Sequence, residues 1–333
     1  MSRVLVTGGG GFVGLAIVKK LLEQGRQVVV VGRHQYPEVL KLGGIMAQGD
    51  IRQQDFLTQA CRDCDTVFHV AAKAGVWGTW QEYNSINVLG TENVLKACQA
   101  NGVSQLIYTS TPSVVFDCHD IQGGDESLPY PQEFLCHYAR SKSIAEKMVL
   151  DGSAEGLRTV ALRPHLIWGP GDGHLIPRLL ERGRKQLLKQ VGDGSNMVDI
   201  SYIDNVVDAH LLAAQDLAGP GRSAGNAYFI SQGQPINLWD WINGLFERLS
   251  IHKVEKKVSH GKAYLAGQLM EWLYGLLRIE REPLMTRFLA EQLARSHWFS
   301  IEAAKRDFGY QPKVTTAEGL DRLVAWLRQH HLN

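Results

Sequence analysis

Cysteine is scarce in this chain of 333 residues, and the few cysteines show no pairing pattern. Their number, five, is odd, and a chain of this length buries enough core to fold without disulfides. Cys61 and Cys64 form the only close pair, whereas a zinc site of this type needs a second pair. We therefore expect reduced thiols, a reducing compartment such as the cytoplasm, and no metal.

Long apolar runs and an excess of charge of either sign are also missing. No run reaches the roughly 20 apolar residues that span a membrane, and the first expected strand begins at Arg3, which leaves no room for a signal peptide. Basic residues number 35 and acidic ones 34, a net charge of +1, so no nucleic-acid partner is expected. These absences predict a cytoplasmic protein, with peripheral contact at the inner face of a membrane kept open.

A glycine-rich turn near the start is the first feature that the chain does contain. Gly8-Gly-Gly-Gly-Phe-Val-Gly14 stands between an apolar strand expected at 3–7 and a helix. This is the context of a dinucleotide-binding fingerprint. Gly8 permits the tight turn, Gly11 lets the backbone approach a pyrophosphate at the helix N-terminus, and Gly14 permits close packing of helix on strand. The predicted cofactor contacts of this turn are Gly8, Gly11, Phe12, Val13 and Gly14.

Tyr138 and Lys142, four residues apart, form the second informative pattern. Residues at this spacing lie one above the other on a helix face. A tyrosine hydroxyl titrates near pH 10, and a nearby ammonium group favours the phenolate and lowers that pKa. The pair is therefore expected to donate a proton to a carbonyl that receives a hydride.

Hydroxyl side chains follow the apolar stretch 105–109, between the glycine turn and the tyrosine. At the carboxyl end of a parallel strand they would face the ligand crevice. The glycine turn, this hydroxyl cluster and Tyr-x-x-x-Lys together resemble the extended branch of the short-chain dehydrogenase/reductase superfamily. The resemblance implies catalytic roles for Thr111, Tyr138 and Lys142. Serine is commoner than threonine at the first of these positions, so Ser110 and Ser113 remain alternatives as the second proton donor.

Longer stretches narrow the resemblance to the 3β-hydroxysteroid dehydrogenase group, namely 108–115, 162–172 and 198–205. Three others, at 71–78, 283–289 and 297–302, are similar to the 2-alkyl-3-oxoalkanoate reductases of bacterial long-chain olefin biosynthesis. This similarity implies NADPH-dependent reduction of the 3-keto group of a long-chain 2-alkyl-3-oxoalkanoic acid to the 3-hydroxy acid. The alternatives are an NAD(P)-dependent 3β-hydroxysteroid-type decarboxylating dehydrogenase and a non-catalytic NADP-binding protein.

The same resemblance implies further positions in the site. Asp50 and Ile51 would lie beside the adenine, and Ala71, Ala72 and Pro164 near the nicotinamide end. Asn87 would order water near the catalytic lysine, although a polar residue on a helix face can also have no such role.

Arg33 determines the cofactor that we expect. An acidic residue at the end of the second strand would bind the adenosine ribose and reject a 2′-phosphate. Here the strand ends in Val31-Gly-Arg-His34 without an acid, and arginine holds phosphate by charge-assisted hydrogen bonds. We therefore predict NADPH, with NAD as the alternative if Arg33 is only a surface residue.

Aromatic and cationic side chains are the candidate contacts for an apolar, acidic substrate. The tryptophans would meet alkyl chains, and one of the cations would meet a carboxylate. Their structural alternatives are core residues and solvated surface groups. The candidates are Lys73, Trp77, Ser113, Trp168, His174 and Arg178.

The stretch 263–277 is predicted to be a helix that is apolar nearly all round. Lysines precede it and arginines follow it. It could cover the alkyl chains of the substrate, rest on a membrane surface, contact a partner such as a pathway enzyme, or belong to the core. A homodimer is also kept open.

Strands that alternate with helices predict an α/β fold with a Rossmann-type, doubly wound parallel sheet and a smaller, mainly helical substrate-binding part. Residues 1–165, with about 198–231, would bind NADP; residues 166–197 and 232–333 would bind the substrate. One strand each is expected at 198–202 and 227–231. The polar stretch 116–131 is expected to be a loop that can cover the active site.

Replacing Arg33 with alanine tests the cofactor prediction. An arginine–phosphate hydrogen bond contributes about 1.5–3 kcal/mol, so the Kd for NADPH should rise about 10–150-fold. The Kd for NADH should hardly change, because NADH has no 2′-phosphate. Fluorescence titration with each cofactor measures both constants, and equal losses for the two would indicate a folding role for Arg33 instead.

Overall fold

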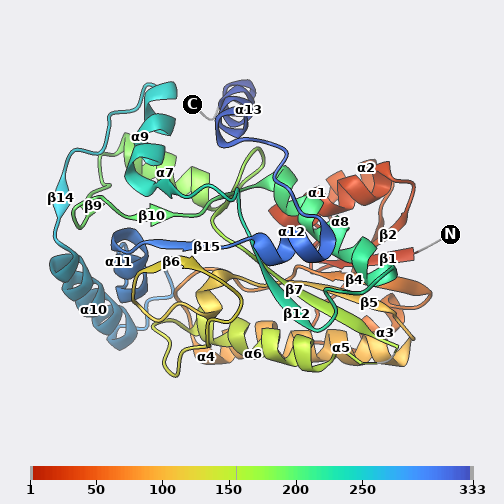
Figure 1. The fold of residues 1–333 in the computed structure, drawn as a ribbon. Coiled ribbons are helices and arrows are strands. Elements are labelled where there is room, and N and C mark those ends of the chain that lie inside the picture. Colours follow the sequence, from red (N-terminus) through yellow and green to blue (C-terminus); the bar gives the residue numbers. More distant parts are fainter. Residues whose placement is uncertain (1–2, 155, 331–333) are drawn as a thin grey trace.

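The computed structural model describes residues 3–154 and 156–330. Its centre is a sheet of seven strands in the spatial order β12-β7-β5-β4-β1-β2-β3, and every neighbouring pair is parallel (Figure 1). The strands are β1 Arg3–Thr7, β2 Gln27–Gly32, β3 Ile45–Gln48, β4 Cys64–His69, β5 Gln105–Thr109, β7 Arg158–Pro164 and β12 Asn226–Ile230.

Helices cover both faces of this sheet (Figure 1). One face carries α1 Phe12–Glu23, α2 Pro37–Lys41 and α8 Ile203–Ala218. The other carries α3 Gln54–Ala60, α4 Trp80–Tyr83, α5 Gly90–Ala100 and α6 His137–Asp151, with a π-helical segment Asn84–Leu89 between α4 and α5. Alternate residues of β1 enter opposite cores, because Val4 packs with α1 and Leu5 with the α3 and α5 layer. This confirms the predicted doubly wound fold.

The second part of the molecule is built from short strands and six helices, within the described residues. The helices are α7 Leu175–Arg184, α9 Leu238–Arg248, α10 His260–Leu276, α11 Arg287–Ala294, α12 Glu302–Phe308 and α13 Thr316–Gln329. The strands are β6 Ile121–Gly124, β8 Ile167–Trp168, β9 Gln190–Val191, β10 Met197–Val198, β11 Ser201–Tyr202, β13 Ile236–Asn237, β14 Lys257–Val258 and β15 His297–Phe299, and a 3-10 turn spans Pro112–Val114. No helix in the described part of the chain has the length and apolar character to cross a membrane.

Two expectations about this second part were wrong. The stretch 116–131 is not simply a loop, because β6 within it pairs in parallel with β15. The single strand expected at 198–202 is two strands in different sheets: β10 pairs with β13 and β15, and β11 pairs with β8. Asp199 separates them, since its buried carboxylate accepts the backbone N–H of Phe299 at 2.7 Å. The segment that follows returns to the central sheet as α8 and β12.

The glycine-rich turn after β1 is tight for a measurable reason. Gly8 has φ +70°, which favours glycine, and its carbonyl accepts the N–H of Gly11 at 3.0 Å. A Cβ on Gly14 would lie only 2.2 Å from that same carbonyl oxygen, whereas a Cβ on Gly11 would lie 3.4 Å from it. A side chain at Gly14 would therefore collide with the backbone of the turn, whereas the turn has room for one at Gly11.

Two alanine substitutions separate packing from cofactor approach. Gly14→Ala should reduce the free energy of unfolding by about 1–3 kcal/mol, the usual cost of overpacking. Gly11→Ala should keep the melting temperature within a few degrees and weaken cofactor binding. Thermal melts with cofactor titrations test both, and a Gly14→Ala protein as stable as wild type would contradict the packing argument.

Candidate active site

Tyr138 and Lys142 lie one turn apart on α6, at the carboxyl edge of the central sheet. The ammonium group of Lys142 is almost fully buried and donates to the carbonyl oxygen of Thr109, the last residue of β5, at 2.6 Å. It also lies 4.1 Å from the ring centre of Tyr108. The lysine is therefore fixed to the end of β5 rather than extended into solvent.

Burial controls the protonation of both groups. It raises the pKa of Tyr138 to about 12, a shift that a side-chain hydrogen bond with Thr111 partly opposes. It lowers the pKa of Lys142 to about 7, against the opposing charge of Glu146. The net lowering of the tyrosine pKa that we expected from Lys142 is absent in the protein without ligands, because burial is the largest effect on Tyr138 and raises its pKa. The consequence suits a reduction, since Tyr138 keeps its proton at neutral pH.

The three candidate hydroxyls occupy different positions after β5. Thr111 caps the 3-10 turn, and its hydroxyl accepts the N–H of Ser113 at 3.3 Å and lies 3.2 Å from the Ser113 hydroxyl. The hydroxyl of Ser110 is buried without a hydrogen-bond partner among the described residues. Thr111 is the one whose side chain interacts with Tyr138.

A chain of buried polar groups connects the glycine turn with the catalytic helix. His69 lies 2.7 Å from the Thr7 hydroxyl through Nδ1 and 2.9 Å from the Thr91 hydroxyl through Nε2. Thr91 donates to the carbonyl of Asn87, and the Asn87 amide donates to the Ser141 hydroxyl at 2.9 Å. Burial and the charge of Lys142 lower the pKa of His69 to about 3, so it stays neutral. This chain fixes β1, β4 and α6 in one arrangement.

Asn87 has a positional role in this arrangement. It sits in the π-helical segment, and its Oδ1 accepts the backbone N–H of Lys73 at 2.7 Å while Nδ2 donates to the carbonyl of Lys73. Both atoms of the amide are therefore engaged by the loop after β4 and by α6. The structure shows that Asn87 holds the backbone of Lys73, and the water-ordering role implied by the resemblance stays a prediction.

A buried ion pair lies one further turn along α6. Glu146 accepts from Nε and Nη2 of Arg163, with the shortest distance 2.6 Å, and also accepts from the Tyr130 hydroxyl at 2.6 Å. The two charged side chains are 0 % and 3 % exposed. Because Glu146 raises the pKa of Lys142, this pair sets the electrostatic surroundings of the catalytic lysine.

The turn after β1 fits a dinucleotide. No described side chain caps α1 at Gly11, so the N–H groups of its first turn, including Phe12 and Val13, can meet an anion. The Gly8 Cα lies against the backbone of Ala71, where a Cβ would come within 2.8 Å. A side chain at Gly8 would therefore collide with the loop after β4.

The other predicted cofactor residues surround this turn. Arg33 is exposed directly after β2, and its charge contributes to the lowered pKa of Asp50, although the main cause is a hydrogen bond from Arg52. Ile51 is buried against Gly90. Ala71 and Ala72 follow β4, and Pro164 ends β7.

Two of the candidate substrate cations already have acidic partners. Lys73 Nζ lies 3.6 Å from Glu82, and Arg178 forms a bidentate pair with Glu282, with the shorter distance 2.6 Å. Trp77 donates through Nε1 to the carbonyl of Ile279 at 2.9 Å. The loop after β4 is therefore joined to the segment after α10, and α7 is joined to the same segment.

Trp168 and His174 lie apart from the other substrate candidates, Lys73, Trp77 and Arg178. Trp168 is 0 % exposed and packs against Tyr202 and Trp241 in the core, so its assignment to the substrate was wrong. The sequence pattern of an aromatic residue after a strand is the same whether that residue lies in the core or at the entrance of a binding site. His174 is exposed at the start of α7, and its backbone N–H donates to Asp172.

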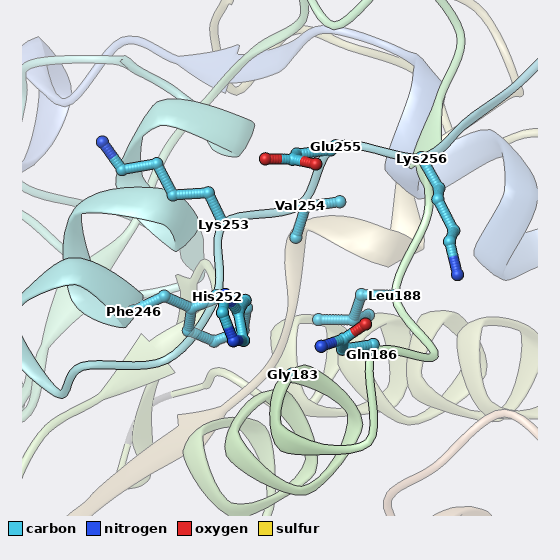
Figure 2. A pocket seen from close by; sticks show the side chains of 9 residues that line it. All are labelled: Gly183, Gln186, Leu188, Phe246, His252, Lys253, Val254, Glu255 and Lys256. Carbon is cyan, nitrogen blue, oxygen red and sulfur yellow. The ribbon is translucent and has the colours of Figure 1, made fainter.

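Figure 2 shows a separate cavity of about 110 Å³ between α7, α9 and the segment that leads to β14. Gly183, Phe246, His252 and Lys256 are among its lining residues, and it contains none of the predicted catalytic residues.

Several residues near the predicted site have contacts that no sequence motif indicates. Tyr36 packs its ring against Gly10 and Gly32 beside Arg33, and a Cβ on Gly10 would lie 2.3 Å from that ring. His165 follows Pro164, and its Nε2 lies 2.6 Å from Nδ1 of buried His297. The sequence offered one signal for such buried polar contacts: a polar residue in an otherwise apolar strand, as at His69 in β4.

The family model for the 3-beta hydroxysteroid dehydrogenase/isomerase family matches residues 5–259. The chain belongs to this family. It is an oxidoreductase of the extended short-chain dehydrogenase/reductase type that uses a nicotinamide cofactor. The match begins in β1 and ends directly before α10.

Individual relatives agree with the family. A 2-alkyl-3-oxoalkanoate reductase of Stenotrophomonas maltophilia (strain K279a) is 48 % identical over 97 % of this chain and 98 % of its own length. A decarboxylating sterol-4-alpha-carboxylate 3-dehydrogenase of Mus musculus is 34 % identical over 99 % of this chain and 92 % of its own. Among solved structures, a dTDP-glucose 4,6-dehydratase of Streptomyces venezuelae with bound NAD has a TM-score of 0.77 at 25 % identity, covering 99 % of this chain and 98 % of that one.

Replacing Lys142 with methionine tests the buried charge. An unfolded lysine titrates near 10.4, whereas burial lowers the pKa of Lys142 to about 7. Below pH 7 the ammonium is charged in both states, so the folded state bears the full cost of burying it. As the pH rises from 7 towards 10.4, the folded protein loses the charge first and the cost disappears.

The stability of Lys142→Met relative to wild type should therefore be highest below pH 7. It should fall by up to about 4 kcal/mol as the pH rises towards 10.4. Lys147→Met, on an exposed position of the same helix, is the control. Denaturant melts across pH measure the difference, and a difference that grows with pH would contradict the account.

Proposed function

We propose that this protein reduces the 3-keto group of a long-chain 2-alkyl-3-oxoalkanoic acid with NADPH and forms the 2-alkyl-3-hydroxyalkanoic acid. The observation that carries the proposal is the protonated, half-buried Tyr138, which interacts with Thr111 and lies one helical turn before Lys142, in a chain 48 % identical to a 2-alkyl-3-oxoalkanoate reductase. The five free cysteines support a reducing compartment, which we propose is the cytoplasm.

When bound, the nicotinamide supplies the hydride. Tyr138 donates its proton to the ketone oxygen as negative charge develops there, and Thr111 is a second donor to the same oxygen. Lys142 would hold the nicotinamide ribose. Its partial neutrality at pH 7 limits the cost of burying a charge at this position. Because these groups are already fixed by β5 and α6, little reorganisation accompanies the reaction.

Arg33 supports the choice of NADPH over NADH. It is exposed at the end of β2, and no acidic residue occupies the positions directly after that strand. Asp50, a predicted adenine contact, accepts hydrogen bonds from the Arg52 side chain through both carboxylate oxygens. Its negative charge is therefore shared with Arg52 and does not fully neutralise Arg33. NAD bound to a distant structural relative does not decide this preference.

The substrate carboxylate would compete with Glu82 for Lys73 or with Glu282 for Arg178. Each of these pairs is partly exposed, so exchange of one carboxylate for another costs little. We propose Trp77 as the apolar contact at the same opening, since its ring packs edge-on to Tyr274 at 6.1 Å.

A second candidate function is oxidation of a 3β-hydroxy sterol acid with loss of carbon dioxide. The murine relative supports it, and both reactions interconvert a β-hydroxy and a β-keto acid. The direction of the reaction and the substrate shape separate them. NADPH consumption with a 2-alkyl-3-oxo acid supports the reductase, whereas activity confined to sterol carboxylates and oxidised cofactor would overturn it.

Replacing Tyr138 with phenylalanine should preserve NADPH binding and lower kcat by about 10²–10⁴-fold, the usual contribution of a general acid. Tyr264→Phe makes the same chemical change on α10 and should leave kcat near the wild-type value. Steady-state assays with a 2-alkyl-3-oxo acid, together with cofactor titrations, give both quantities. A Tyr138→Phe enzyme with more than about a tenth of the wild-type kcat would show that another group donates the proton.

A further inference from the structure

The outer face of α10 is the largest unexplained apolar feature of the described residues. Its inner face is buried, because Ala263 is 3 % exposed and a Cβ on Gly267 would lie 2.5 Å from the backbone of Thr286, directly before α11. The outer face consists of Leu265, Leu269, Trp272 and Leu276, each 62–65 % exposed, with Leu273, Leu277 and Leu284 between 41 % and 59 %. Core burial is therefore excluded for these side chains.

Cations stand at both ends of this outer face. Lys256, Lys257 and Lys262 precede or begin it, and Arg278 and Arg281 follow it. None of these five has an ion-pair partner among residues 3–154 and 156–330, whereas Lys253 pairs with Glu247. Figure 1 shows β14, which carries Lys257, and α10 along the same edge of the molecule.

The acidic groups of the same segment do not cancel this charge. Glu271 is turned inward and accepts from Arg287 on α11 at 2.7 Å, and Glu282 pairs with Arg178. Glu255 and Glu280 are the remaining carboxylates between residues 253 and 284, and His260 pairs with Glu291. Outside this segment, Lys257 lowers the pKa of Asp193, and Arg281 lowers that of Glu181, which already pairs with Lys185. The five cations still outnumber Glu255, Glu280 and Asp193, so positive charge is in excess around the apolar face.

We propose that α10 lies on a phospholipid bilayer with anionic head groups and inserts its outer face into the interface. Leucine and tryptophan suit the boundary between acyl chains and head groups, and lysine and arginine beside them attract anionic lipids. A helix of 17 residues that cannot cross a membrane is long enough to lie along one, about 25 Å in extent. The unpaired cations favour a lipid surface over a second copy of this chain, which would bring the same positive charge.

The placement of α10 connects this surface with the proposed active site. Tyr274 on α10 packs against Trp77, and Ile279 after α10 accepts the Trp77 hydrogen bond. The loop that bears Lys73 and Trp77 is thus held by the end of the interfacial helix. This step rests on the proposed function: an apolar acid dissolved in a bilayer would reach the loop that bears Lys73 and Trp77 without crossing water.

Vesicle sedimentation of the whole chain tests the docking without any activity assay. Wild-type protein should sediment with vesicles of phosphatidylcholine mixed with phosphatidylglycerol, and more weakly with phosphatidylcholine alone. Leu269→Ser combined with Trp272→Ser should lower the partition coefficient at least about tenfold. Leu40→Ser combined with Leu42→Ser is the matched control, because both leucines are exposed around α2, far from α10 (Figure 1).

Charge is tested separately by Lys262→Gln combined with Arg278→Gln. This variant should lose most of the preference for phosphatidylglycerol, and added salt should have the same effect on wild type. Melting temperatures of all variants confirm that each is folded.

Absence of sedimentation by wild type would overturn the proposal, as would equal losses in the α10 and α2 variants. A dimer that only the α10 variant dissociates, without vesicle binding, would assign the face to a second copy and also overturn it. Since none of these results depends on turnover, they are distinguishable from failure of the proposed reaction.

Discussion

Desolvation of the Lys142 ammonium group is the constraint on which the active site depends. The side chain is 2 % exposed, and a carbonyl at the end of β5 and an aromatic ring are its nearest partners. Glu146, which is itself paired with Arg163, is the charged group that raises the pKa of Lys142 against this desolvation. The same dry surroundings keep Tyr138 protonated. A reduction needs a proton donor that still holds its proton at neutral pH, and Tyr138 meets that condition.

The central sheet supplies the rigidity that such a site requires. Parallel strands end at one edge, so Thr7, His69 and Thr109 come together there although they are far apart in sequence. The buried polar chain through Thr91 and Asn87 then links those strand ends to α6. Every donor in this chain has a partner, which fixes one arrangement and makes the loop that bears Lys73 part of it.

Local signals in the sequence were sufficient for the sheet, the glycine turn and the Tyr138–Lys142 pair, because strand periodicity and motif spacing act over a few residues. They were insufficient where the answer depends on distant partners. Trp168 was assigned to the mouth and lies in the core because Tyr202 and Trp241 cover it. The tyrosine pKa was expected to fall with the lysine charge, yet burial, which needs the whole fold, is the larger effect. His165 and His297 are 132 positions apart and meet only in the folded chain.

The central claim is that burial, rather than the lysine charge, sets the protonation of Tyr138. An ultraviolet difference titration of wild type against Tyr138→Phe, without cofactor, isolates the absorbance of this one phenolate. The account predicts no difference signal from phenolate up to about pH 10, where an ordinary tyrosine titrates, because the pKa of Tyr138 is raised to about 12. A phenolate signal that rises near pH 7 would contradict it.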